Sequence, residues 1–253
     1  STSTTTTPAG LSLTATTGID VLTGGAGDDT ITADLINEAG VANVTTLGSL
    51  DTVDGGAGAD SMTAVYDDAI APTISNVETI TLSTRAAVAF DAVNITGLTT
   101  LNLSSSSNAS DINNLGSIPT VNVSNSTAGI DLDFTATAVA GTADTLNLTV
   151  SSVTAGTFTI DAGIETIAIA SNGAVANTIA DLTTGAAGAS ELTLSGAMDL
   201  TITASLDAGV TTINGSAMTG AMTVTQDAAA NITVTGGSGN DSIDLGGDNF
   251  DGN

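Results

Sequence analysis

Short stretches in which apolar and polar residues alternate recur along most of the chain. The clearest have the form Thr-apolar-x-apolar and lie at residues 79–82, 100–103, 120–123, 145–148 and 166–169. Strict alternation over so short a span, with many β-branched residues, is typical of a half-buried β-strand, and no helical periodicity competes with it. The pattern therefore predicts an all-β protein.

The spacing of these stretches indicates how the strands are arranged. Their starts are 21, 20, 25 and 21 residues apart, and a period of this length is typical of a solenoid, in which each repeat packs against its neighbours. We expect parallel strands, stacked as in a β-helix or β-roll, over residues 76–190. After residue 190 similar stretches follow at 192–194, 200–202, 222–224, 232–234 and 243–245. This closer spacing predicts a narrower solenoid over residues 191–253.

Two alternatives to an uninterrupted solenoid stay open. A β-sandwich, or a mixture of β-domains, would also give short, regularly spaced strands. Asn-Gly and Asp-Gly pairs at 172–173, 214–215 and 54–55 suit its hairpin turns, but only 2% of the residues are aromatic, which is few for a sandwich core. A helical insertion near residues 67–71 or 174–187 is also compatible with the pattern.

The two ends of the sequence have a composition of their own. Residues 1–10 are rich in Ser and Thr, and we expect a linker there, with a capping strand as the alternative. The sequence stops within a stretch rich in Gly and Asp, so we expect it to be a fragment of a longer protein. It contains no secretory signal pattern and no apolar run of membrane-spanning length, and targeting information is expected outside it.

The charge of the chain points to bound cations. The 27 acidic residues face one Arg and no Lys or His, which gives a formal charge of −26. Self-repulsion on this scale opposes a compact state, yet 41% of the residues are hydrophobic, which does not fit a disordered acidic tail. All but four of the acidic residues are Asp, the residue that turns and oxygen-rich cation sites favour. Calcium is therefore the expected counterion.

The same composition excludes several functional classes. With Arg85 as the only cation, we expect neither nucleic-acid binding nor attraction to anionic membranes. The absence of Cys and His excludes disulfides, zinc sites with those ligands, and Ser-His-Asp or Cys-His catalysis. Two enzyme classes stay open: a carboxylate pair for glycoside hydrolysis, and a calcium-assisted lyase with Arg85, Tyr66 or an N-terminal amine as base. The chain, however, largely lacks aromatic side chains on which sugars could stack. We expect no enzyme.

Three glycine-rich stretches carry the candidate chemistry. Residues 24–32, 55–63 and 236–244 match the pattern Gly-Gly-x-Gly-x-Asp-x-apolar-x. The glycines allow a tight turn and leave carbonyl oxygens accessible, the Asp supplies a carboxylate, and the apolar residue begins the following strand. Each match is therefore a candidate half of an oxygen cage for calcium.

Degenerate copies accompany these nonapeptides. Residues 18–22 and 49–53 are partial copies in register with the first two matches, so that Asp20 and Asp51 lie nine residues before Asp29 and Asp60. Residues 246–251 continue the third match imperfectly. We expect stacked turns that share ions, because an ion held between two turns takes ligands from both. The candidate ligands of several calcium ions are the Asp and Gly residues of these turns: Asp20, Gly24, Gly25, Gly27, Asp29, Asp51, Gly55, Gly56, Gly58, Asp60, Gly236, Gly237, Gly239, Asp241, Gly247 and Asp251.

The nonapeptides resemble the calcium-binding repeats of RTX (repeats-in-toxin) proteins. The resemblance implies a parallel β-roll that binds calcium between its turns, and export by type I secretion. RTX blocks typically repeat the nonapeptide without interruption, whereas the copies here are scattered. Residues 11–75 are therefore expected to form an RTX-like segment, and residues 191–253 are expected to end in a truncated one.

A second resemblance fits the interruptions better. A glycine-rich turn followed by a Glu-Thr-apolar strand, at 55–60 and 77–82 and in part again at 164–167, is similar to Caulobacter-type crystalline surface-layer (S-layer) proteins. This resemblance implies a secreted, calcium-dependent solenoid that forms a lattice with copies of itself on the bacterial surface. Cell-surface polysaccharide would be bound by a region outside this chain, with no membrane insertion. The alternative is a calcium-stiffened spacer of a secreted RTX adhesin or RTX enzyme.

Glu78 and Glu165 occupy equivalent places in this phrase, each directly before a predicted strand. Two roles are open for them. They are either further calcium ligands or solvated residues at the corners of the solenoid.

Overall fold

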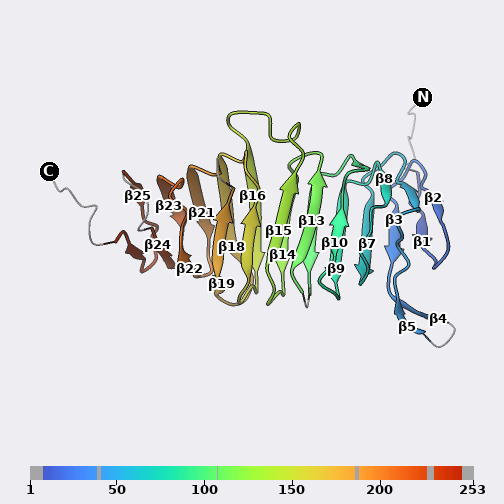
Figure 1. Ribbon diagram of the computed structural model, residues 1–253, viewed down its shortest axis with the longest axis horizontal. Helices are drawn as coiled ribbons and strands as arrows, with labels where there is room; N and C mark the ends of the chain where they lie inside the picture. Colours follow the sequence, from blue (N-terminus) through green and yellow to red (C-terminus); the bar gives the residue numbers. More distant parts are fainter. Residues whose placement is uncertain (1–7, 39–40, 107, 186–187, 227–230, 247–253) are drawn as a thin grey trace, which may run out of the picture.

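The computed structural model describes residues 8–38, 41–106, 108–185, 188–226 and 231–246. Within these ranges the chain is all-β and contains no helix. The strands stack side by side into an elongated solenoid of about ten turns (Figure 1). The fold class predicted from the alternating pattern is thereby confirmed.

One long parallel sheet runs through the whole described solenoid. Its neighbouring strands are separated in sequence by one turn of the solenoid, here called a rung. Its eleven strands are β1 (Ser12–Thr14), β3 (Thr30–Ala33), β7 (Ser61–Tyr66), β9 (Thr79–Thr84), β12 (Thr100–Ser104), β14 (Thr120–Ser124), β16 (Thr145–Ser151), β18 (Thr166–Asn172), β21 (Glu191–Gly196), β23 (Thr212–Met218) and β25 (Thr233–Thr235).

Three shorter parallel sheets form the rest of the wall. The N-terminal sheet contains β2 (Val21–Thr23), β6 (Thr52–Asp54), β8 (Thr73–Ser75) and β11 (Ile95–Thr96). The middle sheet contains β10 (Ala89–Asp91), β13 (Ser110–Leu115), β15 (Ile130–Phe134), β17 (Thr157–Ile160) and β20 (Asp181–Thr184). The C-terminal sheet contains β19 (Asn177–Ile179), β22 (Leu200–Ser205), β24 (Met222–Thr225) and β26 (Ser242–Asp244).

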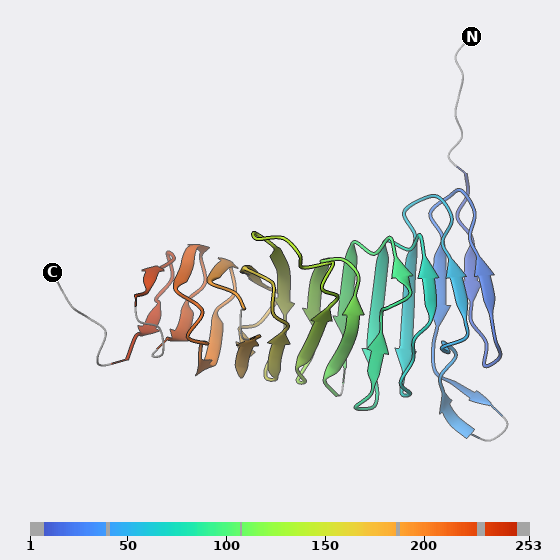
Figure 2. The ribbon, with the colours of Figure 1, turned by 45° about the horizontal axis from the view of Figure 1, so that its top comes forward.

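An antiparallel hairpin interrupts the second rung. It consists of β4 (Ile36–Glu38) and β5 (Val41–Val44), and Figures 1 and 2 show it projecting from the stack near the N-terminal end. This insertion explains why the paired residues Thr30 and Ser61 lie 31 residues apart, whereas Ser61 and its next partner Thr79 lie 18 apart. It is the one antiparallel pair within the described ranges, so the sandwich alternative is wrong.

The prediction of a narrower solenoid after residue 190 is also wrong. Glu191 pairs with Thr212, and Thr212 pairs with Thr233, so the rungs of the long sheet keep a 21-residue period there. The ten-residue spacing arises because β21, β23 and β25 belong to the long sheet while β22, β24 and β26 belong to the C-terminal sheet. Each rung in this region therefore contributes two alternating strands, one to the long sheet and one to the C-terminal sheet.

The two suggested helical insertions are also not found in the described residues. Residues 67–71 form a bend and an isolated bridge, in which Ile70 pairs with Phe90. The described part of the stretch 174–187 contains the strands β19 and β20.

The core consists of inward side chains stacked rung upon rung. Leu101 pairs with Val121 on one side and Ile80 on the other, and all three are at most 2% exposed. The alternation of the strands places these side chains in the interior and their polar neighbours outside. Such ladders explain how a chain with few aromatic residues buries enough apolar surface to fold.

One buried polar residue ties a corner of the solenoid together. Asn177, which is 1% exposed, accepts the backbone N–H of Val153 at 2.9 Å. Its amide nitrogen donates to Ser171 Oγ at 2.9 Å and to the carbonyl oxygens of Asn172 and Val150 at 2.9 and 3.3 Å. Because every polar atom of the side chain has a partner, the burial of this amide is compensated.

Candidate calcium-binding turns

The first two nonapeptides form turns that lie directly on one another. Gly24 donates its backbone N–H to the carbonyl oxygen of Asp54 at 2.7 Å, and Ala57 donates to the carbonyl oxygen of Gly25 at 2.9 Å. A Cβ atom added at Gly24 would overlap the carbonyl oxygen of Gly55. Only glycine therefore permits this approach, which gathers backbone carbonyl groups of two turns in one small volume.

The glycines of the second turn also need an unusual backbone conformation. Gly56 has φ of 94°, and a Cβ atom there would overlap the carbonyl oxygen of Gly25. Gly58 has φ of 149°, and its Cβ position lies 2.5 Å from the carbonyl oxygen of Gly27. These positions fit the glycine-rich pattern because side chains are excluded both by conformation and by the neighbouring turn.

Asp60 is the most distinctive residue of this pair of turns. It is 1% exposed, and its Oδ1 accepts the backbone N–H of Asp29 at 2.7 Å. Its Oδ2 is buried and has no hydrogen-bond partner among the described residues. Burial raises the pKa of this carboxyl group, the hydrogen bond from Asp29 works against that rise, and the negative charges of Asp29, Glu78 and Asp28 add to it. A buried carboxylate oxygen without a partner is costly, and a bound cation would satisfy it.

Asp29 has a different environment from Asp60. Its Oδ1 accepts the backbone N–H of Leu11, and its Oδ2 accepts that of Gly25, both at 2.5 Å. The carboxylate thus links its own turn to the preceding rung, and both oxygens have partners without an ion.

The third nonapeptide resembles the first in its hydrogen bonds. Asp241 Oδ1 accepts the backbone N–H of Met222 at 3.0 Å, and Oδ2 accepts that of Gly237 at 2.7 Å. The Cβ positions of Gly237 and Gly239 meet the backbone carbonyls of Met218 and Gly220. This turn therefore stacks on residues 215–220, which do not form a nonapeptide. Gly236, in the same turn, is exposed, while Gly247 and Asp251 lie outside the described residues.

Asp20 and Asp51 lie in a separate stack of turns. Asp20 donates its backbone N–H to Asp51 Oδ1 at 2.9 Å, and Gly48 donates to Asp51 Oδ2 at 2.6 Å. The two residues precede β2 and β6 of the N-terminal sheet, whereas Asp29 and Asp60 precede strands of the long sheet. The expected stacking of turns nine residues apart is therefore wrong for these copies. Turns nine residues apart precede strands of different sheets, whereas these turns stack on the turn one rung away, which is 31 residues away here because the hairpin lengthens this rung.

Glu78 and Glu165 make a contact that neither of the two roles considered for them includes. Glu78 Oε2 accepts the backbone N–H of Asp60 at 2.7 Å, and Glu165 Oε2 accepts that of Asp144 at the same distance. Each glutamate thus bridges two rungs, as Asp29 and Asp60 do. The shared Glu-Thr-apolar pattern indicated that Glu78 and Glu165 occupy equivalent positions. It did not indicate that each accepts a hydrogen bond from the neighbouring rung.

A second acidic region was missed by sequence reasoning. Three successive rungs of the middle sheet carry acidic residues: Asp111 in β13, Asp131 and Asp133 in β15, and Asp161 directly after β17. Asp111 pairs directly with Asp131. Burial, with the charges of Asp111 and Asp161, raises the pKa of Asp131, and burial, with the charges of Asp131, Asp161 and Asp111, raises that of Asp133. Asp131 Oδ1 is a buried oxygen without a partner. In the sequence, this acidic region is indicated only by the alternation of Asp with apolar residues at 111–112 and 131–133.

The acidic residues are spread along the solenoid rather than gathered at one point. Within the described ranges no three acidic side chains converge closely enough to hold a metal ion by themselves. A calcium ion would therefore need carbonyl oxygens as well. The stacked turns at 24–29 and 55–60 fit that requirement, because they combine crowded backbone carbonyls with the partnerless oxygen of Asp60.

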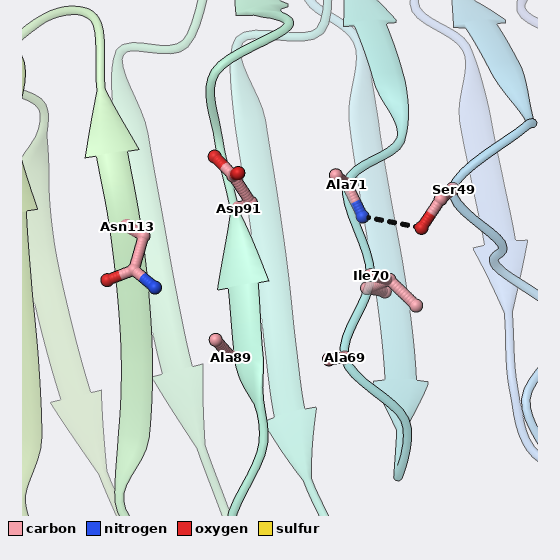
Figure 3. A pocket seen from close by; sticks show the side chains of 7 residues that line it. All are labelled: Ser49, Ala69, Ile70, Ala71, Ala89, Asp91 and Asn113. Carbon is pink, nitrogen blue, oxygen red and sulfur yellow. Dashed lines mark hydrogen bonds between the residues drawn. The ribbon is translucent and has the colours of Figure 1, made fainter.

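Two open hollows lie away from the glycine-rich turns. One of about 270 Å³, shown in Figure 3, is lined by Ser49, Ala69, Ile70, Ala71, Ala89, Asp91 and Asn113. Ala71 donates its N–H to Ser49 Oγ across it at 3.0 Å. The other, of about 460 Å³, is lined by Phe134, Ala136, Val139, Asp161, Ala162, Gly163 and Glu165.

The described ranges contain no helix that is long and apolar enough to span a membrane.

Comparison with known families agrees with the geometry of the turns. A family model described as the RTX calcium-binding nonapeptide repeat (4 copies) matches residues 12–35, 46–64 and 233–249. No curated protein matches the chain. RTX calcium-binding nonapeptide repeats are therefore present, and the matched residues include all three nonapeptides.

Proposed function

We propose that this chain is a structural segment of a secreted bacterial surface-layer protein, in which calcium stiffens the solenoid and copies assemble into a lattice. The observation that carries the calcium part is the buried Oδ2 of Asp60, which lacks a partner between two stacked glycine-rich turns. The lattice part rests on the resemblance in sequence to S-layer proteins and on the long parallel sheet that runs through the described solenoid (Figure 1).

The residues that would hold calcium are the carbonyl groups of Gly24–Gly27 and Gly55–Gly58 together with the carboxylate of Asp60. Calcium, when bound, supplies the positive charge that the chain itself lacks, given its formal charge of −26. The glycines keep the two turns close, and Asp29 fixes Asp60 by its backbone N–H. Binding to the folded state alone would then stabilise the solenoid.

We also propose that the chain has no catalytic role. Arg85 is the only basic side chain in the sequence, and its Nη1 donates to the carbonyl oxygen of Ser105 at 3.3 Å on the surface. Neither hollow described above contains it. Hydrolytic and lyase turnover on polysaccharides is therefore expected to be undetectable.

A spacer in an RTX adhesin or RTX enzyme is the second candidate, and the elongated shape of the solenoid favours it (Figure 2). Light scattering over a calcium series distinguishes the two. The lattice proposal predicts a monomer in EDTA and growing particles in millimolar calcium, with ordered sheets in electron micrographs. A rigid monomer at every calcium concentration, in the full-length protein as well, would contradict the lattice and favour the spacer.

A further inference from the structure

The outer face of the long sheet differs from the rest of this acidic protein. It consists of the outward side chains of its eleven strands, which alternate with buried ones, as in β12 and β14. These outward positions hold Thr, Ser, Asn and Ala, apart from Val65 and Glu191. Glu191 is thus the single charged residue on a face that extends over the whole described solenoid.

The other acidic residues of the described ranges lie elsewhere. Asp111, Asp131, Asp133 and Asp161 follow the middle sheet, and others lie at the turns before strands, such as Asp29 and Asp60. Two copies that meet through these surfaces would bring like charges together, which costs free energy and slows association. The outer face of the long sheet avoids this repulsion.

Hydrogen bonds between side chains on this face reduce the free-energy penalty of removing the face from water when a partner covers it. Asn122 Nδ2 donates to Asn102 Oδ1 at 2.9 Å, and Asn102 Nδ2 donates to Thr81 Oγ1 at 3.1 Å. These side chains therefore form a ladder across β14, β12 and β9. Polar groups that are already paired within the sheet can lose contact with water at a smaller penalty than unpaired ones.

The dimensions of the face suit a second copy. Eleven strands spaced about 4.8 Å apart extend over about 48 Å, and strands of roughly five residues add a width of about 17 Å. The resulting area of about 800 Å² is what one partner buries in a stable protein–protein interface. Short, uniform side chains in rows also allow two sheets to pack face to face at about 10 Å.

We infer that the outer face of the long sheet is the surface through which two copies of this chain associate face to face. The inference rests on the proposed function, because it names the contact within the assembly. A pairing of identical surfaces has two-fold symmetry. The central strand of the sheet is β14, so the symmetry axis passes near its middle outward residue, Asn122.

Cysteine cross-linking tests this contact, because the chain has no cysteine of its own. Two single variants are compared under oxidising conditions in calcium: Asn122→Cys at the centre of the face, and Thr159→Cys on the outer side of the middle sheet. We expect Asn122→Cys to form a disulfide-linked dimer and Thr159→Cys to stay largely monomeric. Reducing agent should release the dimer.

A charge at the same positions gives a second readout that needs no oxidation. Asn122→Asp places two like charges opposite each other at the axis and should weaken association at least about tenfold. Thr159→Asp adds the same charge outside the face and should leave association unchanged. Melting temperatures of both variants, measured as isolated chains in EDTA, show whether folding is affected.

The outcomes separate this inference from the proposed function. If the unmodified chain associates in calcium, but Asn122→Cys does not cross-link and Asn122→Asp associates normally, this inference alone is overturned. If the unmodified chain does not associate at all, the proposed assembly fails and the inference fails with it. Loss of adsorption to cell-wall polysaccharide by Asn122→Asp, without any cross-linked dimer, would assign the face to another occupant and would also overturn it.

Discussion

Replacement of Asp60 by Asn is expected to change stability in opposite directions with and without calcium. Asp60 is buried and its Oδ2 has no partner among the described residues. Burial raises the pKa of its carboxyl group, and the negative charges of Asp29, Glu78 and Asp28 raise that pKa further. The asparagine side chain is almost the same size, keeps an oxygen for the N–H of Asp29, and carries no charge. The same change removes the carboxylate that a calcium ion would use.

The magnitudes of the two effects follow from these contacts. Removal of the negative charge of a buried carboxylate is worth about 1–3 kcal/mol, and weakening of the hydrogen bond from Asp29 costs about 1 kcal/mol. The net gain without calcium is about 1 kcal/mol, or about 2–4 °C in melting temperature for a chain of this size. In calcium at a hundredfold excess over its dissociation constant, an intact site would contribute about 2.7 kcal/mol, and the variant loses most of that.

Thermal unfolding followed by circular dichroism, in EDTA and in calcium, measures both effects. Asp60→Asn should melt above the unmodified chain in EDTA and below it in calcium. Asp181→Asn, on the middle sheet outside the nonapeptides, removes one charge elsewhere and should show no such reversal. A lower melting temperature for Asp60→Asn in EDTA, or an unreduced response to calcium, would refute the assignment of Asp60 as the ligand.

Three further predictions concern the glycines, a buried amide and the acidic region of the middle sheet. Gly24→Ala should lower the melting temperature clearly, because its Cβ would overlap a carbonyl of the next turn, whereas Gly18→Ala, with its nearest atom at 3.6 Å, should change little. Asn177→Ala leaves several buried groups unpaired and should shift the urea midpoint by the equivalent of at least about 2 kcal/mol. Burial raises the pKa values of Asp131 and Asp133 above the ordinary 3.8. The folded state therefore binds more protons than the unfolded state as the pH falls from neutral toward 3.8. In EDTA, the free energy of unfolding contributed by these two residues should rise over this pH range. Melting curves over this pH range should show a smaller rise for an Asp131→Asn variant.

The strands of the long sheet could be predicted because each is specified by local alternation. Thr100 pairs with Thr120 and Thr79, and the three phrases that begin with these residues pair in register. A solenoid of this kind repeats the same requirement in each rung: β-branched or leucine side chains inside and short polar ones outside. The sequence therefore predicts both the strand type and the parallel stacking.

The assignment of strands to walls could not be predicted from the same pattern. Strands such as β21 and β22 have nearly identical alternation, although one belongs to the long sheet and the other to the C-terminal sheet. Periodicity gives the distance between strands but does not identify which of them are neighbours. The hairpin of β4 and β5 was missed for a related reason, since it adds residues to a rung without changing the pattern before or after it.

The candidate site was predicted in part. The glycine-rich turns were recognisable because only glycine allows their close contact, as at Gly24 and Gly55. The contacts of Glu78 and Asp131 were not recognisable, because each depends on which residues of a neighbouring rung lie opposite. Glu78, for example, meets the N–H of Asp60, 18 residues earlier in the chain.

Calcium in the glycine-rich turns is proposed to stabilise this solenoid. The most direct test is the melting temperature of the unmodified chain in EDTA and after calcium is restored. With one site, and calcium at a hundredfold excess over its dissociation constant, we expect the melting temperature to rise reversibly by roughly 5–10 °C, and by more if several turns bind. Superimposable melting curves in calcium and EDTA would contradict it.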